Sequence, residues 1–269
     1  MPDIASFLHS VKLPVMPEVA HALIRTLSDD EADILTVTRI IEKDPGLTAT
    51  LLRMANSAIF GLSRTVRTLD SAVSVVGMSQ IRARALSVCM ANAFVFPPNL
   101  DRLEFWRSSM VCAGYTRWLA THIAQDEQQA WLTGMMLRLG ELVIVNRMPE
   151  VIASIEALPC STIQRWERER EHAGFDEGQL SAEIARRWDF PDAVTLALAS
   201  SAQPLSGKVS VLAGIVHLGA ILAGSQSAPA QALGELPVLV VQALALDQDR
   251  LLATLPRTES FSDISMLQA

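Results

Sequence analysis

Aromatic side chains and regular apolar–polar alternation are both scarce in this sequence of 269 residues. Aromatic residues make up 5% of the chain, although hydrophobic residues make up 50% of it. So high an apolar content argues against an intrinsically disordered chain, and the lack of two-residue alternation argues against β-sheets. Ala, Leu and Val dominate the apolar set, and this mixture favours helices because small and straight-chain side chains lose little freedom there. We therefore predict an all-α globular protein.

Cysteine is also rare, and Cys89, Cys112 and Cys160 form no CxxC pair. An odd number of cysteines argues against a disulfide framework, so we expect reduced thiols in a cytoplasmic protein. Residues 1–12 lack a basic region followed by an apolar stretch, which predicts no secretion signal. The longest apolar stretch, residues 209–223, is too short to span a bilayer. It predicts a buried helix with His217 as a core histidine that has a hydrogen-bond partner, and no membrane contact is expected.

Basic charge is in deficit, because 22 Lys and Arg residues face 29 Asp and Glu residues, a formal net charge of −7. Such a negative field repels phosphate backbones, so we expect no general nucleic-acid binding. Arginines are nonetheless frequent in the first hundred residues. They are either solvated helix faces or, at Arg53, Arg64 and Arg67, a patch for a partner or a small anionic ligand.

Several helix starts carry recognisable capping signals. Asp44 can cap the first free amides of a helix, and Pro45 fits its first turn; this helix is expected to end near Gly61. Thr68 is expected to open a further helix. Ser28 and Glu31 have the spacing of a capping box before a helix that contains Val37, Ile40 and Ile41.

A proline pair divides the sequence into two parts. Pro97-Pro98 breaks the helical pattern, so we expect one helical subdomain over residues 1–98 and a second over residues 99–255. Residues 256–269 are polar and are expected to form a loose tail. Residues 165–171 are dense in charges of alternating sign, which predicts a solvent-exposed helix face.

The order and the amino-acid sequences of several segments resemble those of one known family. They are Leu13–Ala20 (LPVMPEVA), Ile40–Thr48 (IIEKDPGLT), Leu51–Gly61 (LLRMANSAIFG), Leu69–Gly77 (LDSAVSVVG), Phe105-Trp106, Gly134–Gly140 (GMMLRLG) and Trp188–Pro191 (WDFP). Over residues 10 to 225 this resembles the HDOD family, the HD-related output domain of bacterial signalling proteins. The resemblance implies an all-α fold of two helical subdomains, an HDOD-specific N-terminal bundle and an HD-phosphohydrolase-like C-terminal bundle. It also implies a regulatory or scaffolding module without catalysis.

A working HD phosphohydrolase needs a metal ion held by histidines and aspartates on facing helices. The resemblance places the corresponding positions at residues that are neither His nor Asp: Ser108, Leu137, Arg138, Glu177, Ser200, Ser201 and Ala220. The guanidinium of Arg138 would repel a metal ion. We therefore expect a degenerate HD pocket with no catalytic residue, no metal and no cofactor.

Two charges fall in this expected pocket. Arg138 and Glu177 could pair with each other, so that an ion pair replaces the ion as a structural pin. Glu141, three residues after Arg138 on the same helix face, is the rival partner, and a third possibility is that Arg138 reaches solvent.

Three functions remain open. The preferred one is a module that binds other signalling proteins, with Ile59 and Phe60 as candidate contact residues unless they fill the interface between the subdomains. The second is a sensor for a nucleotide or other anion, which would need a converging cluster of Arg53, Arg64 and Arg67. The third is a residual metal-dependent phosphohydrolase.

Overall fold

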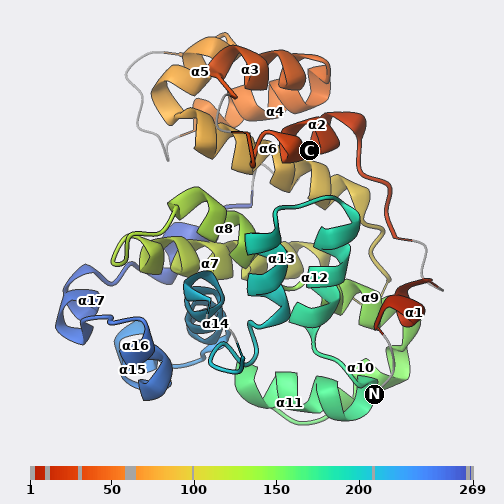
Figure 1. The fold of residues 1–269 in the computed structure, drawn as a ribbon, viewed down its shortest axis with the longest axis vertical. Coiled ribbons are helices and arrows are strands. Elements are labelled where there is room, and N and C mark those ends of the chain that lie inside the picture. Colours follow the sequence, from red (N-terminus) through yellow and green to blue (C-terminus); the bar gives the residue numbers. More distant parts are fainter. Residues whose placement is uncertain are drawn as a thin grey trace. The chain divides into compact units, whose positions relative to one another are not determined.

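The computed structural model describes residues 4–9, 13–29, 32–57, 65–98, 100–207, 210–264 and 267. These residues form helices and no strand, which confirms the predicted all-α class (Figure 1). The chain divides into two compact units, of which unit 1 comprises Met1–Leu13, Phe96–Arg187 and Asp192–Asp263. Unit 2 comprises Pro14–Val95, Trp188–Pro191 and Ile264–Ala269. The division between Val95 and Phe96 lies close to the expected boundary after residue 98, but Met1–Leu13 belongs to unit 1.

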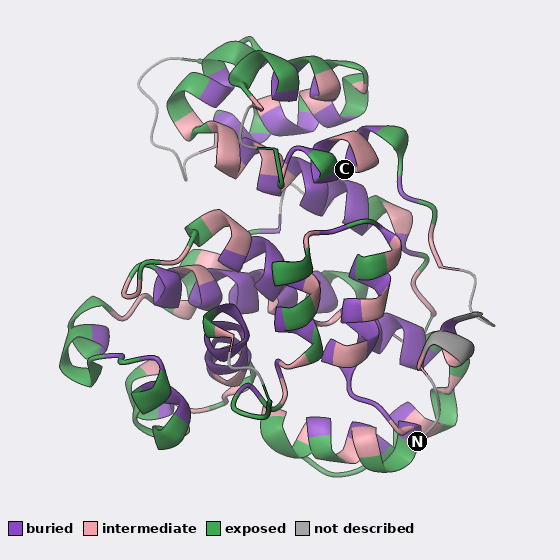
Figure 2. Cartoon of the chain, in the orientation of Figure 1, coloured by how far each residue is buried: buried purple, intermediate pink, exposed green. Residues whose placement is uncertain are grey.

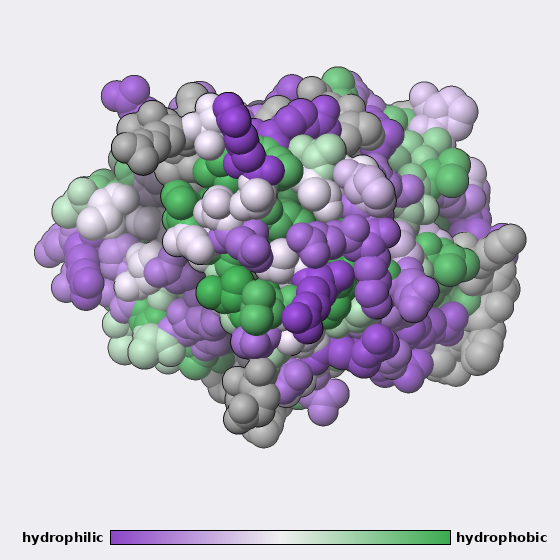
Figure 3. All heavy atoms as spheres, turned by 90° about the horizontal axis from the view of Figure 1, so that it is seen from above, coloured by the Kyte–Doolittle hydropathy of each residue, from purple (hydrophilic) through white to green (hydrophobic). Residues whose placement is uncertain are grey.

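Unit 2 is a bundle of short helices. They are α2 (Glu18–Arg25), α3 (Ile34–Glu42), α4 (Pro45–Ala55), α5 (Leu69–Val76) and α6 (Met78–Ala93). Two capping predictions are confirmed, because the Asp44 carboxylate accepts from the backbone N–H of Leu47 at 2.9 Å and the Thr68 hydroxyl from that of Ser71 at 3.2 Å. Gly77, at φ 95°, joins α5 to α6, a backbone conformation that glycine adopts without strain. Hydrophobic patches lie among hydrophilic side chains on the face seen from above (Figure 3).

The capping box expected at Ser28 and Glu31 does not begin α3, and Glu31 lies outside the described residues. Helix α3 begins at Ile34, and the residue that caps it is Asp33, whose Oδ1 accepts from the backbone N–H of Thr36 at 2.7 Å. Asp33 stands next to the first helical residue and reaches the free amides of the first turn directly, whereas Ser28 follows the end of α2 too closely.

Helix α4 ends earlier than the sequence predicted. It was expected to run to Gly61, but it ends at Ala55. The side chain of Asn56 donates to the carbonyl of Leu52 at 2.7 Å, and it exchanges two hydrogen bonds of 2.7 Å with the backbone of Val66. These bonds satisfy the helix end and fix the chain where it returns towards α5.

Unit 1 contains the remaining helices. They are α1 (Ile4–His9), α7 (Arg102–Ala120), α8 (Glu127–Met136), α9 (Leu139–Arg147), α10 (Pro149–Ile155), α11 (Thr162–Ala173), α12 (Glu177–Arg187), α13 (Asp192–Ala199), α14 (Val211–Gly224), α15 (Pro229–Gly234), α16 (Val238–Ala243), α17 (Gln248–Thr254) and the 3-10 turn η2 (Thr258–Phe261). Helices α7 and α14 are buried along most of their length (Figure 2). Gly134 and Gly219 let α8 and α14 approach Thr116 on α7 so closely that a Cβ at either position would meet its hydroxyl. Among the described residues, we find no helix with the length and hydropathy needed to cross a bilayer.

The end of unit 1 is ordered against α7, so the expectation of a loose tail from residue 256 is wrong for residues 256–263. The Tyr115 hydroxyl lies 2.7 Å from that of Thr258, and the rings of Tyr115 and Phe261 meet edge to face at 5.2 Å. The missing side chain of Gly114 leaves room for the Phe261 ring. An aromatic residue that is polar at one end and apolar at the other anchors this segment on the helix.

Gly140 provides a test of the packing that positions the site. A Cβ at this position would lie 2.1 Å from the carbonyl oxygen of Glu177 and 2.8 Å from the Cβ of Leu180, so α9 and α12 would have to separate. We expect Gly140→Ala to lower the free energy of unfolding by about 2–3 kcal/mol. Urea and thermal unfolding measure this change. Gly234→Ala is the matched control, since a Cβ there meets no atom within 4 Å, and equal losses in both variants would contradict the close packing.

Candidate functional site

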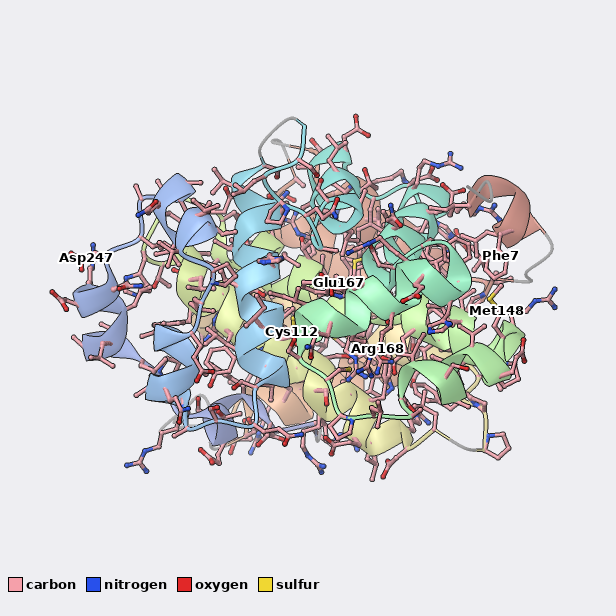
Figure 4. All side chains as sticks on the ribbon, turned by 90° about the horizontal axis from the view of Figure 1, so that it is seen from below. Phe7, Cys112, Met148, Glu167, Arg168 and Asp247 are labelled. Carbon is pink, nitrogen blue, oxygen red and sulfur yellow. The ribbon has the colours of Figure 1, made fainter. Side chains whose placement is uncertain are left out.

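Unit 1 contains a cavity of about 190 Å³ where four helices and the link between α8 and α9 meet. It is lined by Ser108 and Cys112 of α7, Leu137 and Arg138 between α8 and α9, Cys160 to Thr162 and Arg165 at the start of α11, Glu177 of α12, and Ala220, Ala223 and Gly224 of α14. Cys112 lies between α11 and α14 in the view from below (Figure 4). Of the residues expected in a degenerate HD pocket, Ser108, Leu137, Arg138, Glu177 and Ala220 thus surround one cavity.

The other two residues of that expected set lie elsewhere. Ser200 is partly exposed, and its hydroxyl donates to the carbonyl of Leu196 at 2.5 Å. Ser201 is fully buried against Gly178, its hydroxyl donates to the carbonyl of Leu198 at 2.8 Å, and its own carbonyl faces His217. The serine pair follows the end of α13, so its hydroxyls satisfy the carbonyls of that helix end instead of facing the cavity.

Ser181 of α12 fixes the backbone that carries Arg138. Its hydroxyl donates to the carbonyl of Leu137 at 2.6 Å and accepts from the N–H of Gly140 at 2.7 Å. Arg138 therefore stands at the first turn of α9, where Nε donates to Oε2 of Glu141 at 2.8 Å. Its guanidinium also lies 5.2 Å from the centre of the Phe105 ring. The expected Arg138–Glu177 ion pair is wrong, because the rival Glu141 on the same turn takes that place.

Glu141 binds a second guanidinium. Its Oε1 accepts from Nη2 of Arg165 at 3.0 Å, and Arg165 also reaches Glu169 and Glu156, each at 3.2 Å. The side chains of Glu141 and Glu169 are 1% and 0% exposed. Burial opposes the charge on Glu141, but Arg138 and Arg165 outweigh it and lower the pKa of this carboxyl. The expectation of a solvent-exposed face is therefore wrong for Arg165 and Glu169, which point into unit 1 beside Trp166.

Glu177 is the carboxyl that this network leaves partly unsatisfied. Its backbone N–H donates to Oε2 of Glu169 at 2.7 Å, and its Oε1 accepts from Nε1 of Trp166 at 2.9 Å. Its Oε2 is buried and has no hydrogen-bond partner in the part of the chain that the structure describes. Burial and the charge of Glu141 raise the pKa of Glu177 to about 7, against the opposing effect of Arg138 and Arg165.

A second buried carboxyl shares this environment. Burial and the nearby Glu177 raise the pKa of Glu169, while Arg165 acts in the opposite direction. Three buried carboxyls therefore compete for the guanidiniums of Arg138 and Arg165. Since Glu141 bonds to both guanidiniums and Glu169 to one, Glu177 is the group with least compensation for its charge.

His217 of α14 is buried and is not among the residues that line the cavity. Its Nδ1 is 2.7 Å from the carbonyl oxygen of Ser201, and its ring is 5.2 Å from that of Trp166. Burial lowers the pKa of His217, which favours the neutral ring with Nδ1 as the donor to that carbonyl. The prediction of a core histidine with a hydrogen-bond partner is confirmed.

The residues around the cavity do not fit a divalent metal ion. The guanidiniums of Arg138 and Arg165 line it, and each is held in place by carboxylates. Burial raises the pKa of Cys112 to about 12, so this side chain stays a neutral thiol and not the thiolate that binds metals. Of the described residues on the lining, Glu177 is then the one with a carboxyl, and none has an imidazole. Among the described residues, no group of three or more His, Cys, Asp and Glu side chains is placed to hold an ion.

Comparison with known proteins identifies the family. The model of the HDOD domain matches residues 13–204. The chain belongs to the HDOD family. A solved protein of Shewanella amazonensis SB2B, provisionally named a phosphohydrolase, is 23% identical with a TM-score of 0.81, covering 98% of this chain and 97% of its own. A solved protein of Marinobacter aquaeolei VT8, provisionally named a signal transduction protein, is 23% identical with a TM-score of 0.79, covering 98% of this chain and 61% of its own.

A curated relative is an uncharacterized protein of Treponema pallidum (strain Nichols). It is 20% identical over 185 residues, which amount to 68% of this HDOD chain and 36% of the relative. The chain therefore spans little more than a third of that relative's length. At these levels of identity, the two solved structures show that the all-α fold is shared.

The arginine patch expected in unit 2 is only partly within the described residues. Arg53 is exposed, with Nη2 donating to the Thr50 hydroxyl at 3.1 Å, and Arg67 is also exposed. Arg64, Ile59 and Phe60 lie outside the described residues. The patch and the contact role of Ile59 and Phe60 in this HDOD chain stay predictions.

Sequence reasoning missed more than half of the residues that line the cavity. The residues it missed are Cys112, Cys160, Ser161, Thr162, Arg165, Ala223 and Gly224. Two signals could have found some of them. Cys112 stands four residues after Ser108 and therefore on the same face of α7, and Ser161 with Gln164 forms a reciprocal capping box that fixes where α11 begins.

A double-mutant cycle tests the pairing of Arg138 with Glu141. We expect Glu141→Ala to lower the free energy of unfolding by about 3–5 kcal/mol, because it leaves two guanidiniums without their shared partner. Arg138→Ala and Glu141→Ala should be non-additive, with a coupling energy larger than that of Arg138→Ala with Glu177→Ala. Urea unfolding of the single and double variants measures both couplings. Arg186→Ala, which removes an exposed pair with Glu183, is the control and should change little. A larger coupling with Glu177 would contradict the observed pairing.

The raised pKa of Glu177 predicts a dependence of stability on pH. Between pH 4.5, the ordinary value for Glu, and about 7, the folded chain holds a proton on Glu177 that the unfolded chain has lost. This group's contribution is therefore complete below that window and lost as the pH rises through it, by about 3 kcal/mol in total. Glu177→Gln mimics the protonated form, so its stability relative to the wild type should increase from pH 5 to pH 8. A difference that does not change with pH would contradict the raised pKa.

Proposed function

We propose that this HDOD chain is a regulatory or scaffolding module of bacterial signalling that acts through contacts with other proteins and catalyses no reaction. The observation that carries the proposal is the pair of guanidiniums, Arg138 and Arg165, fixed in the cavity where the family resemblance places an HD metal centre. A metal-dependent phosphohydrolase needs an ion in that volume to generate a nucleophilic hydroxide and to polarise the phosphoryl oxygen.

The charge network supports the absence of catalysis. The guanidiniums of Arg138 and Arg165 would repel a divalent ion placed in the cavity. If Glu141 turned away from them to bind the ion, both guanidiniums would lose their shared partner. Two thiols line the cavity: burial keeps Cys112 protonated, and no imidazole stands among the described lining residues to activate Cys160. The cavity therefore offers neither an ion site nor an activated nucleophile.

The family and the surface support a role in partner binding. The HDOD family is associated with signalling, and the Marinobacter aquaeolei protein of the same fold is provisionally named a signal transduction protein. Several large apolar side chains of unit 2 are exposed to solvent: Val15, Ile34, Leu35, Val75 and Val95. Exposed apolar side chains are the kind that partner proteins cover. As part of the proposal we place the chain in the cytoplasm, where its free thiols remain reduced.

Two measurements test this function together. Purified chain supplied with Mn²⁺ should not hydrolyse bis(p-nitrophenyl) phosphate above the rate of Mn²⁺ alone, and in its native cell it should be cross-linked to signalling proteins that retrieve it reciprocally when they are tagged. The double variant Leu137→His, Arg138→Asp removes one guanidinium and supplies two ligands, so it should bind Mn²⁺ more tightly than the wild type. Turnover by the wild-type chain that a chelator abolishes would sink the proposal, as would Mn²⁺ affinity equal to that of the double variant.

A further inference from the structure

One carboxylate oxygen at the cavity, Oε2 of Glu177, accepts no hydrogen bond from the described residues. Glu177 is 3% exposed, its Oε1 is used by Trp166, and its Oε2 is buried and unpaired while the residue lines the cavity. When Glu177 is ionised, leaving its buried Oε2 without a donor is costly, and the cost is removed when a bound molecule supplies an N–H or O–H.

An anion does not meet this need for a donor. Arg165 already directs Nε, Nη1 and Nη2 at the carboxylates of Glu169, Glu156 and Glu141. Arg138 directs Nε and Nη2 at Glu141. An anion in the cavity would compete with these carboxylates for the guanidiniums, and the ionised carboxyl of Glu177 on the same lining would repel it.

A cation is no better suited. Although it would satisfy Glu177, it would lie in the same small cavity as the guanidiniums of Arg138 and Arg165. Like charges at such short range disfavour one another strongly in a buried site. A lining on which the carboxyl of Glu177 lies near the guanidiniums of Arg138 and Arg165 is therefore suited to a molecule without net charge.

We infer that this cavity binds a small uncharged molecule that presents an N–H donor beside a carbonyl acceptor, the chemistry of a cyclic amide such as a pyrimidine or purine base. The N–H donates to Oε2 of Glu177. The carbonyl accepts from Arg138, whose Nη1 is not one of the nitrogens that bind Glu141. Leu137, Ala220 and Ala223 supply the apolar walls against which the flat faces of such a ring pack.

The first turn of α11 favours the same class of molecule. Cys160, Ser161 and Thr162 line the cavity at the N-terminus of this helix of 12 residues, where free amides and the helix dipole attract a carbonyl oxygen. The Thr162 hydroxyl donates to the carbonyl of Ala220 at 3.3 Å and so joins α11 to α14 beside the cavity. A volume of about 190 Å³ admits a molecule of one or two small rings.

Such a ligand would contact helices from three separate parts of unit 1. Its donor would meet α12, its acceptor the start of α9, and its faces α14, so binding would tie these helices together. The ligand site would exist whether or not the chain binds partner proteins or hydrolyses phosphodiesters. Failure of the partner test and failure of ligand binding are therefore separate results.

The test uses the full chain with uracil and hypoxanthine as probes, and with 1,3-dimethyluracil as a matched probe that lacks both N–H donors. Isothermal titration and ligand-observed NMR should show binding of uracil or hypoxanthine, and a preference for uracil over 1,3-dimethyluracil of about tenfold or more whenever uracil binds. Glu177→Gln replaces the free acceptor by an amide donor and should abolish this discrimination, or the hypoxanthine binding where that probe is the one bound. Glu150→Gln, on the exposed face of α10, should retain the wild-type behaviour.

Three results would overturn the inference. The first is that neither uracil nor hypoxanthine binds at concentrations up to their solubility. The second is that 1,3-dimethyluracil binds as well as uracil, and the third is that inorganic phosphate binds more tightly than either base. Because Glu177→Gln keeps the acceptor for Trp166 and mimics the protonated side chain, its fold can be checked by Tm before the titrations.

Discussion

The carboxylate of Glu141, held between two guanidiniums, is the interaction on which the rest of the site depends. Its two oxygens bind Arg138 and Arg165 at 2.8 and 3.0 Å, and its side chain is 1% exposed. The two arginines come from different helices, so one buried carboxylate connects the start of α9 to α11. Burying such a group is favourable only while both partners are present, which makes the geometry of all three residues interdependent.

Because Glu141 binds both guanidiniums, the neighbouring carboxyls of Glu169 and Glu177 have less compensation for their negative charge. Glu169 shares Arg165 with Glu141, whereas among the described residues Glu177 has one side-chain hydrogen bond, at Oε1, and no ion pair. A buried group in that position gains a proton more easily than it would in water, and it responds to any molecule that offers a donor. The saturated pairs hold together the helices around the cavity, and the Oε2 of Glu177, unpaired among the described residues, is the atom on which the proposed ligand selectivity rests.

What the sequence could predict follows the range of each interaction. Asp44 and Thr68 cap helices through bonds to amides three residues away, so their roles could be inferred locally. The resemblance to HDOD sequences indicated the region of the cavity. The partner of Arg138 was undecided because Glu141 lies three residues away and Glu177 lies across the unit. The exposure of Arg165 and Glu169 was mispredicted for a related reason: charged residues usually face water, and only the tertiary position of Glu141 explains why these two are buried.

An ion pair and a metal ion differ in what they leave for a ligand. A divalent ion held by side chains keeps open coordination positions, and these are what bind water and substrate in a hydrolase. A guanidinium bound by carboxylates has donors and acceptors that satisfy one another, so it holds helices together without activating water. In this cavity the remaining unsatisfied atom is an acceptor and not a Lewis acid. Such an acceptor fits the proposed recognition of a donor, and with it the proposed module that responds to a molecule without transforming it.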